Sequence, residues 1–279
     1  MQPTQFSRTA IGAAGHRAAH QVLERGRIFA DPLALRILGE DAERALAEAA
    51  ENPSRRGLRL RIAVRSRVAE DAAHRAISEG VRQIVVLGAG LDTFAYRLNA
   101  ETGLRVFEVD HPATQAEKRR RLAAADIAAP AHLTYAPCDF EGAELGEALT
   151  SAGFDPGRRS FFLWLGVVPY LSQAAVFATL GYIAKLPGGA EVVFDYPNPI
   201  ESVGDPEARK AFQALADRVA ALGEALQTFF VTPDLHERLR ALGFTKIDDL
   251  GPLAMAARFF PDETPRQGAS GVHVVVAGT

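Results

Sequence analysis

The stretch from Ile84 to Thr93 constrains the fold of this chain more than any other. Its first residues, Ile84 to Leu87, are all apolar and mostly β-branched, and they run directly into the turn Gly88–Gly90. A short apolar run bounded by glycine is typical of a strand buried on both faces of a parallel sheet. Glycines after such a strand allow a sharp turn and the close approach of a ligand to the backbone. The stretch therefore predicts a nucleotide-cofactor loop.

Strands and helices alternate from residue 81 onward, which predicts an α/β fold with a mainly parallel sheet and helices on both faces. Strands are expected at 84–87, 105–110, 133–137, 160–166, 191–196, 244–250 and 271–277. Helices are expected between them at 91–100, 113–125, 144–152, 173–186 and 233–242.

Two helical segments are added to this alternation, within what we expect to be one domain spanning residues 1–279. Residues 1–80 are rich in helix formers and predict an N-terminal cap, including a basic amphipathic helix over 55–78. Residues 197–230 predict a lid insertion with a helix at 206–226. The cofactor-binding core then spans 81–196, and residues 231–279 complete the sheet, with a long loop at 251–270.

Composition excludes several classes of protein. The net charge of −3 lacks the basic excess of a nucleic-acid-binding domain. The single cysteine, Cys138, excludes an intrachain disulfide and a cysteine-rich zinc site, so no metal is expected. No signal peptide is visible at the N-terminus, and the longest apolar run, 161–171, is far below the ~18 residues of a membrane helix. We expect a cytoplasmic protein without nucleic-acid or membrane partners, and no pattern indicates its oligomeric state.

The glycine loop also carries information about which nucleotide it binds. A dinucleotide fold requires a third glycine, where this chain has Thr93. Asp92 places a carboxylate at the start of the next helix, which repels a pyrophosphate and attracts a cation. Asp110, 20 residues beyond Gly90, suits ribose hydroxyls in either cofactor class. The pattern favours S-adenosylmethionine, which carries a sulfonium and an ammonium, over a nicotinamide dinucleotide.

The residues 86–98, with the sequence VLGAGLDTFAYRL, followed by 106–112, VFEVDHP, closely resemble the leucine carboxyl methyltransferase family. The similarity is greatest to its bacterial branch of small-molecule O-methyltransferases, and it runs from about residue 60 to 196. It implies a Rossmann-like class I methyltransferase fold, with a seven-stranded, mostly parallel sheet whose last strand is antiparallel. Further matching stretches are 65–67, 138–140, 164–171 and 193–196.

The resemblance implies a set of cofactor contacts. Gly88 and Gly90 would let the loop pass beneath S-adenosylmethionine, and Asp110 would accept hydrogen bonds from its ribose. Arg65 would hold the methionine carboxylate as a charge-assisted pair, with Arg67 as the alternative if the helix register differs.

Other implied contacts lie on the neighbouring strands. Asp139 would accept from the adenine amino group, and Phe140 would lie against the ring or serve simply as a core aromatic. Trp164, in the fourth-strand motif, and Asp92, in the loop, complete the predicted cofactor-binding set.

Two positions leave the chemistry of the site open. Family members often have glutamate where this chain has Leu165, which makes the floor of the site more apolar and argues against a mechanism that needs an acid there. Glu108, two residues before Asp110, is expected either to face the cofactor or to pair with the basic N-terminal segment.

Methyl transfer is an in-line displacement, for which a carboxylate acceptor needs no general base and a hydroxyl acceptor does. The candidates near the carboxyl ends of strands are His111, Tyr170, Tyr196 and Asp195, each of which also has a structural interpretation. The leading hypothesis is an O-methyltransferase acting on a carboxylate or hydroxyl of a small molecule, such as a polyketide-type metabolite. The alternatives are a non-catalytic S-adenosylmethionine-binding protein and a nicotinamide-dependent oxidoreductase.

Overall fold

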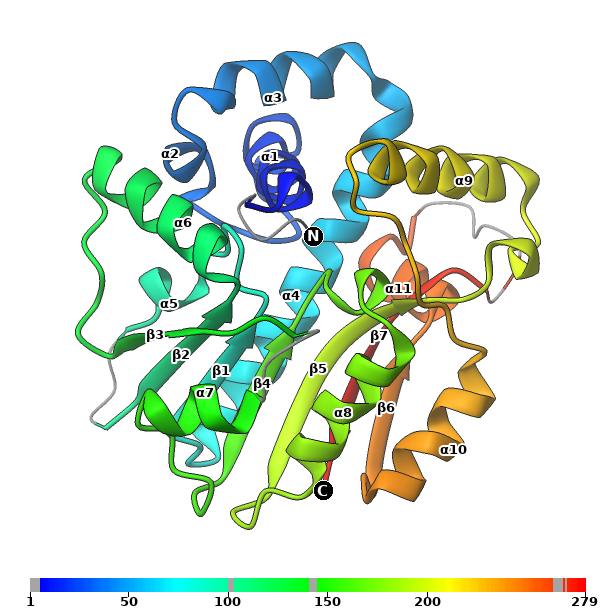
Figure 1. The fold of residues 1–279 in the computed structure, drawn as a ribbon. Coiled ribbons are helices and arrows are strands. Elements are labelled where there is room, and N and C mark those ends of the chain that lie inside the picture. Colours follow the sequence, from blue (N-terminus) through cyan, green and yellow to red (C-terminus); the bar gives the residue numbers. More distant parts are fainter. Residues whose placement is uncertain (1–5, 100–102, 141–144, 263–267, 269) are drawn as a thin grey trace.

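The computed structural model, which describes residues 6–99, 103–140, 145–262, 268 and 270–279, is built on one seven-stranded sheet (Figure 1). The strand order is β3-β2-β1-β4-β5-β7-β6, in which β7 pairs antiparallel with both of its neighbours and the other pairs are parallel. The predicted α/β class and the antiparallel last strand are confirmed. The strands are β1 (Gln83–Leu87), β2 (Arg105–Asp110), β3 (Leu133–Pro137), β4 (Ser160–Trp164), β5 (Ala190–Pro197), β6 (Lys246–Leu250) and β7 (Val272–Gly278).

Helices cover both faces of the sheet and one of its ends, where α1–α3 and α9 lie together (Figure 1). In the described residues no helix is long and apolar enough to cross a bilayer. The helices are α1 (Arg8–Leu23), α2 (Ala34–Leu38), α3 (Asp41–Glu51), α4 (Arg56–Ser78), α5 (Phe94–Arg97), α6 (Pro112–Ala124), α7 (Leu145–Ser151), α8 (Gln173–Ala184), α9 (Pro206–Ala221), α10 (Thr232–Leu242) and α11 (Pro252–Phe259), with short 3₁₀ turns at Pro53–Arg55, Val168–Tyr170 and Ile200–Ser202.

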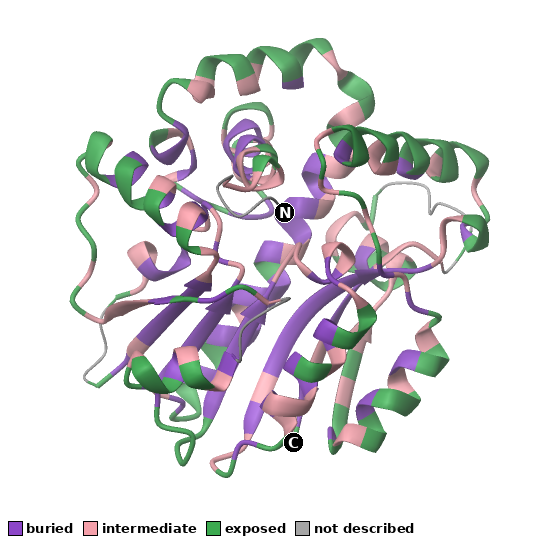
Figure 2. Ribbon diagram, in the orientation of Figure 1, coloured by how far each residue is buried: buried purple, intermediate pink, exposed green. Residues whose placement is uncertain are grey.

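The core divides into layers because successive strand residues point to opposite faces of the sheet. Val85 and Leu87 of β1 pack with α7, α8 and α10, whereas Ile84 and Val86 pack with α4 and α11. Both sets are buried, so the central strands are largely buried and the exposed residues lie mainly on the outer helices and loops (Figure 2). A smaller apolar cluster joins α1 and α2 to Leu91 of the glycine loop.

Several predicted element boundaries are wrong. The helix expected over 91–100 is only the single turn Phe94–Arg97, because the Asp92 carboxylate accepts from the Phe94 amide and Leu98 is extended; residue 100 lies outside the described residues. The loop expected over 251–270 contains α11, and the lid helix ends at Ala221 instead of 226. The predicted start of α7 at residue 144 also lies outside the described residues.

The two ends of the insertion are held together by one side chain, Asn198. Its amide nitrogen donates to the Phe230 carbonyl at 2.8 Å and to the Thr232 hydroxyl at 3.1 Å. Its carbonyl oxygen accepts from the Gly271 amide at 3.0 Å and lies 2.9 Å from Nε2 of His273. The start of the insertion is therefore fastened to its own end and to the last strand.

A buried ion pair holds α6 against β2. Nζ of Lys118 lies 2.8 Å from Oε2 of Glu108, and both side chains are 1% exposed. Burial raises the pKa of Glu108 to about 7, although Lys118 opposes this shift. Of the two roles expected for Glu108, the structure shows a charge partner, but on α6 instead of on the basic N-terminal segment.

We predict that Lys118→Met destabilises the protein by about 3–5 kcal/mol, because it leaves the Glu108 carboxyl group buried without its partner. Urea denaturation should show a lower midpoint with an unchanged slope. Adding Glu108→Leu to Lys118→Met should restore most of the loss. If Lys118→Met alone is as stable as the wild type, the ion pair with Glu108 does not stabilise the fold.

Candidate functional site

A cavity of about 560 Å³ opens at the carboxyl ends of the central strands. This is the edge at which open α/β sheets bind their ligands. Its walls come from the loops after β1 to β5, from α1 and α4 of the N-terminal segment, and from α9 of the insertion. Most of the predicted site residues line it: Arg65, Gly88, Gly90, Asp92, Asp110, His111, Asp139, Phe140 and Tyr170.

Gly88 and Gly90 are constrained both by their backbone conformation and by the atoms around them. Gly88 and Gly90 have positive φ angles of 62° and 44°, a region that disfavours other residues. A Cβ atom at Gly88 would lie 2.3 Å from Cγ2 of Val167, and one at Gly90 would lie 3.1 Å from Cβ of Ala10. The loop is therefore enclosed between the β4 loop and the start of α1.

Asp110 is fixed at the end of β2 by two backbone amides. Its Oδ2 accepts from the Gly90 amide at 2.5 Å, and its Oδ1 accepts from the His111 amide at 2.7 Å. Burial raises the pKa of Asp110 despite these bonds. Nδ1 of His111 accepts from the Ala113 amide at 3.2 Å and so caps α6, which leaves Nε2 as its other polar atom.

The structure separates the two predicted adenine contacts from Trp164, the other predicted cofactor contact on the neighbouring strands. Asp139 and Phe140 line the cavity after β3. Trp164 is fully buried beneath the wall and is not among the lining residues, and its ring centroid lies 6.5 Å from that of Phe140. The prediction that Trp164 contacts the cofactor is therefore corrected to a role in supporting Phe140.

Arg65 reaches into the cavity from α4 and meets the ends of β4 and β5. Its Nη1 lies 3.0 Å from Oδ2 of Asp195, whose Oδ1 accepts from the Gly166 amide at 2.5 Å. Asp195, expected as a candidate base, thus orients Arg65. Arg67, which was the alternative to Arg65 for the methionine carboxylate, points away from the cavity. It pairs with Asp71 at 2.8 Å on the exposed face of α4.

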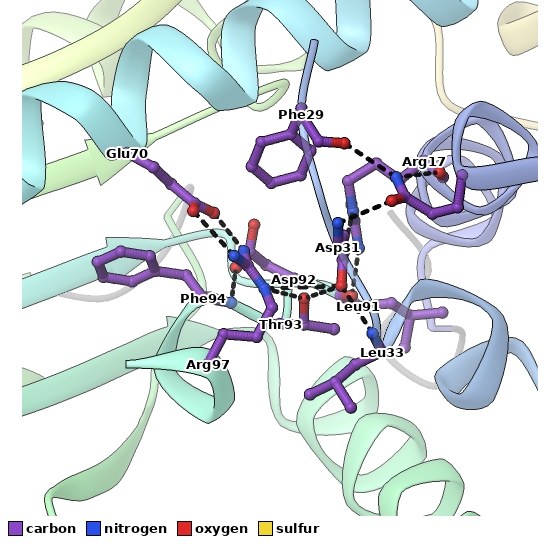
Figure 3. Close-up of polar contacts among 11 residues, drawn as sticks. Arg17, Phe29, Asp31, Leu33, Glu70, Leu91, Asp92, Thr93, Phe94 and Arg97 are labelled. Carbon is purple, nitrogen blue, oxygen red and sulfur yellow. Dashed lines mark hydrogen bonds and ion pairs between the residues drawn. The ribbon is translucent and has the colours of Figure 1, made fainter. Parts of the chain in front are cut away.

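A polar network fastens the glycine loop to the N-terminal segment (Figure 3). Arg17 donates to the Leu91 carbonyl at 2.6 Å and pairs with Asp31 at 3.2 Å, while the Thr93 hydroxyl donates to Asp31 at 2.8 Å. Thr93, which stands where a dinucleotide fold has glycine, is fully buried in this network.

Asp92 lies beside that network as an ionised carboxylate. Its burial favours the neutral form, but Arg17, Lys118 and Arg97 together hold its pKa below the usual range. Arg97 is itself held by a two-point ion pair with Glu70, whose pKa burial raises to about 7 (Figure 3). The loop therefore presents a fixed negative charge to the cavity.

The two tyrosine candidates differ in position. Tyr170 lines the cavity, and burial raises its pKa, so its hydroxyl stays protonated at neutral pH. Tyr196 is fully buried and is not among the lining residues; its hydroxyl donates to Asp249 at 2.6 Å and lies 2.9 Å from the Thr232 hydroxyl. The prediction that Tyr196 contacts substrate is therefore wrong. The side chain is directed toward β6 instead of into the cavity.

Sequence reasoning missed the residues by which α1 and the insertion close the cavity. Glu224, which follows α9, accepts from the Arg8 amide at 2.7 Å, from the Thr9 amide at 3.2 Å and from the Ser7 hydroxyl at 3.1 Å. His16 of α1 and Arg218 of α9 also line the cavity. No spacing pattern connects segments about 200 residues apart, so only the fold reveals this closure.

The comparisons with known proteins place this geometry among methyltransferases. The family model described as leucine carboxyl methyltransferase matches residues 10–184. YktD of Bacillus subtilis (strain 168), named as an S-adenosyl-L-methionine-dependent methyltransferase, is 32% identical over 70% of this chain and 64% of its own length. FRAAL3718 of Frankia alni, named likewise, is 32% identical over 67% of this chain and 66% of its length. These two matches thus span slightly less than two thirds of each relative.

The fold also has a counterpart among solved structures. A crystal structure of a protein described as a methyltransferase, from Thermobifida fusca YX, matches with a TM-score of 0.56 and 20% identity. The match covers 94% of this chain and 93% of that chain. It supports the Rossmann-like methyltransferase fold over nearly the whole length.

We predict that Glu224→Gln loosens the contact between the insertion and α1, because a neutral amide accepts hydrogen bonds less strongly than a carboxylate. Hydrogen exchange of the amides of Arg8 and Thr9 should become about tenfold faster. The exposed Glu207→Gln on α9 serves as the control and should leave these rates unchanged. Equal rates in Glu224→Gln and the wild type would show that the contact does not hold the segment.

Proposed function

Because the chain belongs to the leucine carboxyl methyltransferase family, we propose that it is an S-adenosylmethionine-dependent O-methyltransferase acting on a carboxylate or hydroxyl of a small molecule. The observation that carries this proposal is that Arg65, Asp110 and the two glycines of the loop all line one cavity. A polyketide-type metabolite is one class of acceptor that fits the apolar part of the lining.

The residues present fit each part of S-adenosylmethionine. Gly88 and Gly90 line the cavity with backbone atoms alone, so that the cofactor could pass along them. Asp110 would take the ribose hydroxyls, because each of its oxygens uses only one backbone amide. Asp139 and Phe140 would hold the adenine, and Arg65, already oriented by Asp195, would pair with the methionine carboxylate.

The fixed carboxylate of Asp92 suits a cofactor that carries an ammonium and a sulfonium and repels a pyrophosphate. The same argument disfavours the nicotinamide alternative, because Thr93 is buried against Asp31 and no glycine is available to let a dinucleotide approach the helix.

When bound, S-adenosylmethionine supplies an electrophilic methyl group to an acceptor oxygen. The chain's own contribution is to position the reactants, which in general can supply about 7–11 kcal/mol of a barrier, and to exclude water. Leu165 gives the cavity an apolar floor, while α1 and the insertion cover it. Because the Tyr170 hydroxyl stays protonated, it donates a hydrogen bond to the molecule that receives the methyl group and does not act as a base.

Calorimetry tests the cofactor assignment. S-adenosylmethionine and its demethylated product should both bind, and NADH should not. Transfer of a labelled methyl group into a metabolite extract would then distinguish an enzyme from a non-catalytic binding protein. Tight binding of NADH, or failure of both sulfur compounds to bind, would reject the proposal.

We predict that Arg65→Ala weakens the binding of S-adenosylmethionine by about 1.5–3 kcal/mol and leaves adenosine nearly unaffected, because only the former has a carboxylate. Arg67→Ala, on the same helix but pointing away from the cavity, is the matched control and should change neither affinity. Equal losses for the two ligands in Arg65→Ala would assign Arg65 a purely structural role through Asp195.

A further inference from the structure

Apart from Arg65, the lining residues of α1, α4 and α9 are not used by the proposed cofactor contacts. The wall that they form is partly apolar, with Leu58 of α4 and with Phe212 and Leu215 of α9. Into the same wall α1 places His16 and α9 places Arg218. An apolar surface with a few convergent polar groups is the usual composition of a small-molecule subsite.

Arg218 is an exposed cation at the cavity, and it has no ion-pair or hydrogen-bond partner among the described residues. Burial and the neighbouring charge of Arg55 lower its pKa, which Glu48 only partly offsets. Glu48 is already paired with Arg55 at 3.2 Å. The charge of Arg218 at the cavity is therefore not neutralised by the protein.

The side chain of His16, on α1, is affected by the same positive charges. Its pKa is lowered to about 4 by burial and by the charges of Arg55, Arg59, Arg218 and Arg65. Within the described part of the chain no side chain or backbone group is hydrogen-bonded to its imidazole. At neutral pH His16 is thus an uncharged ring with a free N–H donor on a cationic wall.

The acidic side chains that line the cavity are all engaged elsewhere. Asp195 pairs with Arg65, and Glu224 is bound to the start of α1. Asp92 and Asp110 accept backbone amides at the glycine loop, and Asp139 also has an interaction partner. None of these groups pairs with Arg218, so an anion that enters the cavity could balance its charge.

We propose that Arg218 and His16 form an anion subsite, which binds a carboxylate or phosphate group of the methyl acceptor. This proposal rests on the proposed function, because it names which acceptors the cavity takes. Arg218 supplies the charge and a forked set of donors, and His16 supplies a neutral N–H. The apolar side chains of α4 and α9 cover the hydrocarbon part of the acceptor, and Arg65 is left for the methionine carboxylate.

The subsite can be tested without knowing the natural acceptor. Benzoate, phenyl phosphate and uncharged benzamide are titrated by calorimetry into the protein with and without S-adenosylhomocysteine. We expect at least one anion to bind, and Arg218→Gln to weaken it about tenfold or more while benzamide binding is unchanged. Phenyl phosphate binding tighter than benzoate indicates a phosphate group, and the reverse order indicates a carboxylate.

Lys210→Gln is the matched control, because Lys210 is an exposed cation on the same helix that does not line the cavity. An equal loss of anion binding in both variants would show general electrostatic attraction instead of a specific site, and it would overturn the proposal. Failure of both anions to bind the wild type, or unchanged binding to Arg218→Gln, would also overturn it. Urea denaturation of each variant confirms that the fold is retained.

His16 gives a second readout. A bound anion offsets the arginine charges and raises the pKa of His16, so that benzoate binding near pH 5 should take up protons. Calorimetry in two buffers of different ionisation enthalpy counts these protons, and His16→Gln should abolish the uptake. Wild-type binding without uptake would remove His16 from the subsite. Failure of S-adenosylhomocysteine to bind would reject the proposed function separately, whatever the anions do.

Discussion

The ion pair between Arg17 and Asp31 is the interaction on which the site depends, because it joins the N-terminal helices to the glycine loop (Figure 3). Arg17 also holds the Leu91 carbonyl, and Asp31 also holds the Thr93 hydroxyl. Both charged groups are buried, and each lies near a second group of opposite charge, because Arg97 is 3.6 Å from Asp31 and Arg17 lowers the pKa of Asp92. Through this contact and the bonds from its first residues to Glu224, α1 is held at the wall of the cavity.

The short apolar runs that end in glycine were enough to predict the strands of the sheet, because a strand buried on both faces must be almost entirely apolar. The loop residues Gly88, Gly90 and Asp110 were likewise predictable, since local spacing alone places them at neighbouring strand ends. Tyr196 was not, because strand register decides whether a side chain faces the cavity or β6. His16 and Arg218 were missed because their position depends on packing between distant helices.

The proposed function follows from how charge is distributed around the cavity. Negative groups fixed by backbone amides, Asp92 and Asp110, lie at the glycine loop, whereas unbalanced positive charge lies on the wall of α1, α4 and α9. Such a polarised cavity suits a cationic donor on one side and an anionic acceptor on the other. In the proposed reaction, this arrangement would attract both reactants to one cavity without an acidic residue at the position of Leu165.

The hydrogen bonds of Asn198 have a consequence for how this protein can diversify. Since one side chain fastens residue 198 to residues 230 and 232, the two ends of the insertion meet at the sheet whatever the length of the chain between them. The free energy of closing a loop changes only slowly with its length, so residues could be added or removed between these ends at little cost in loop entropy. The contacts that constrain the segment lie near its end, where Glu224 binds the start of α1 and Thr228 binds the Leu171 carbonyl. Under the proposed function, the earlier part of the insertion could therefore diverge with the acceptor while the glycine loop stays unchanged.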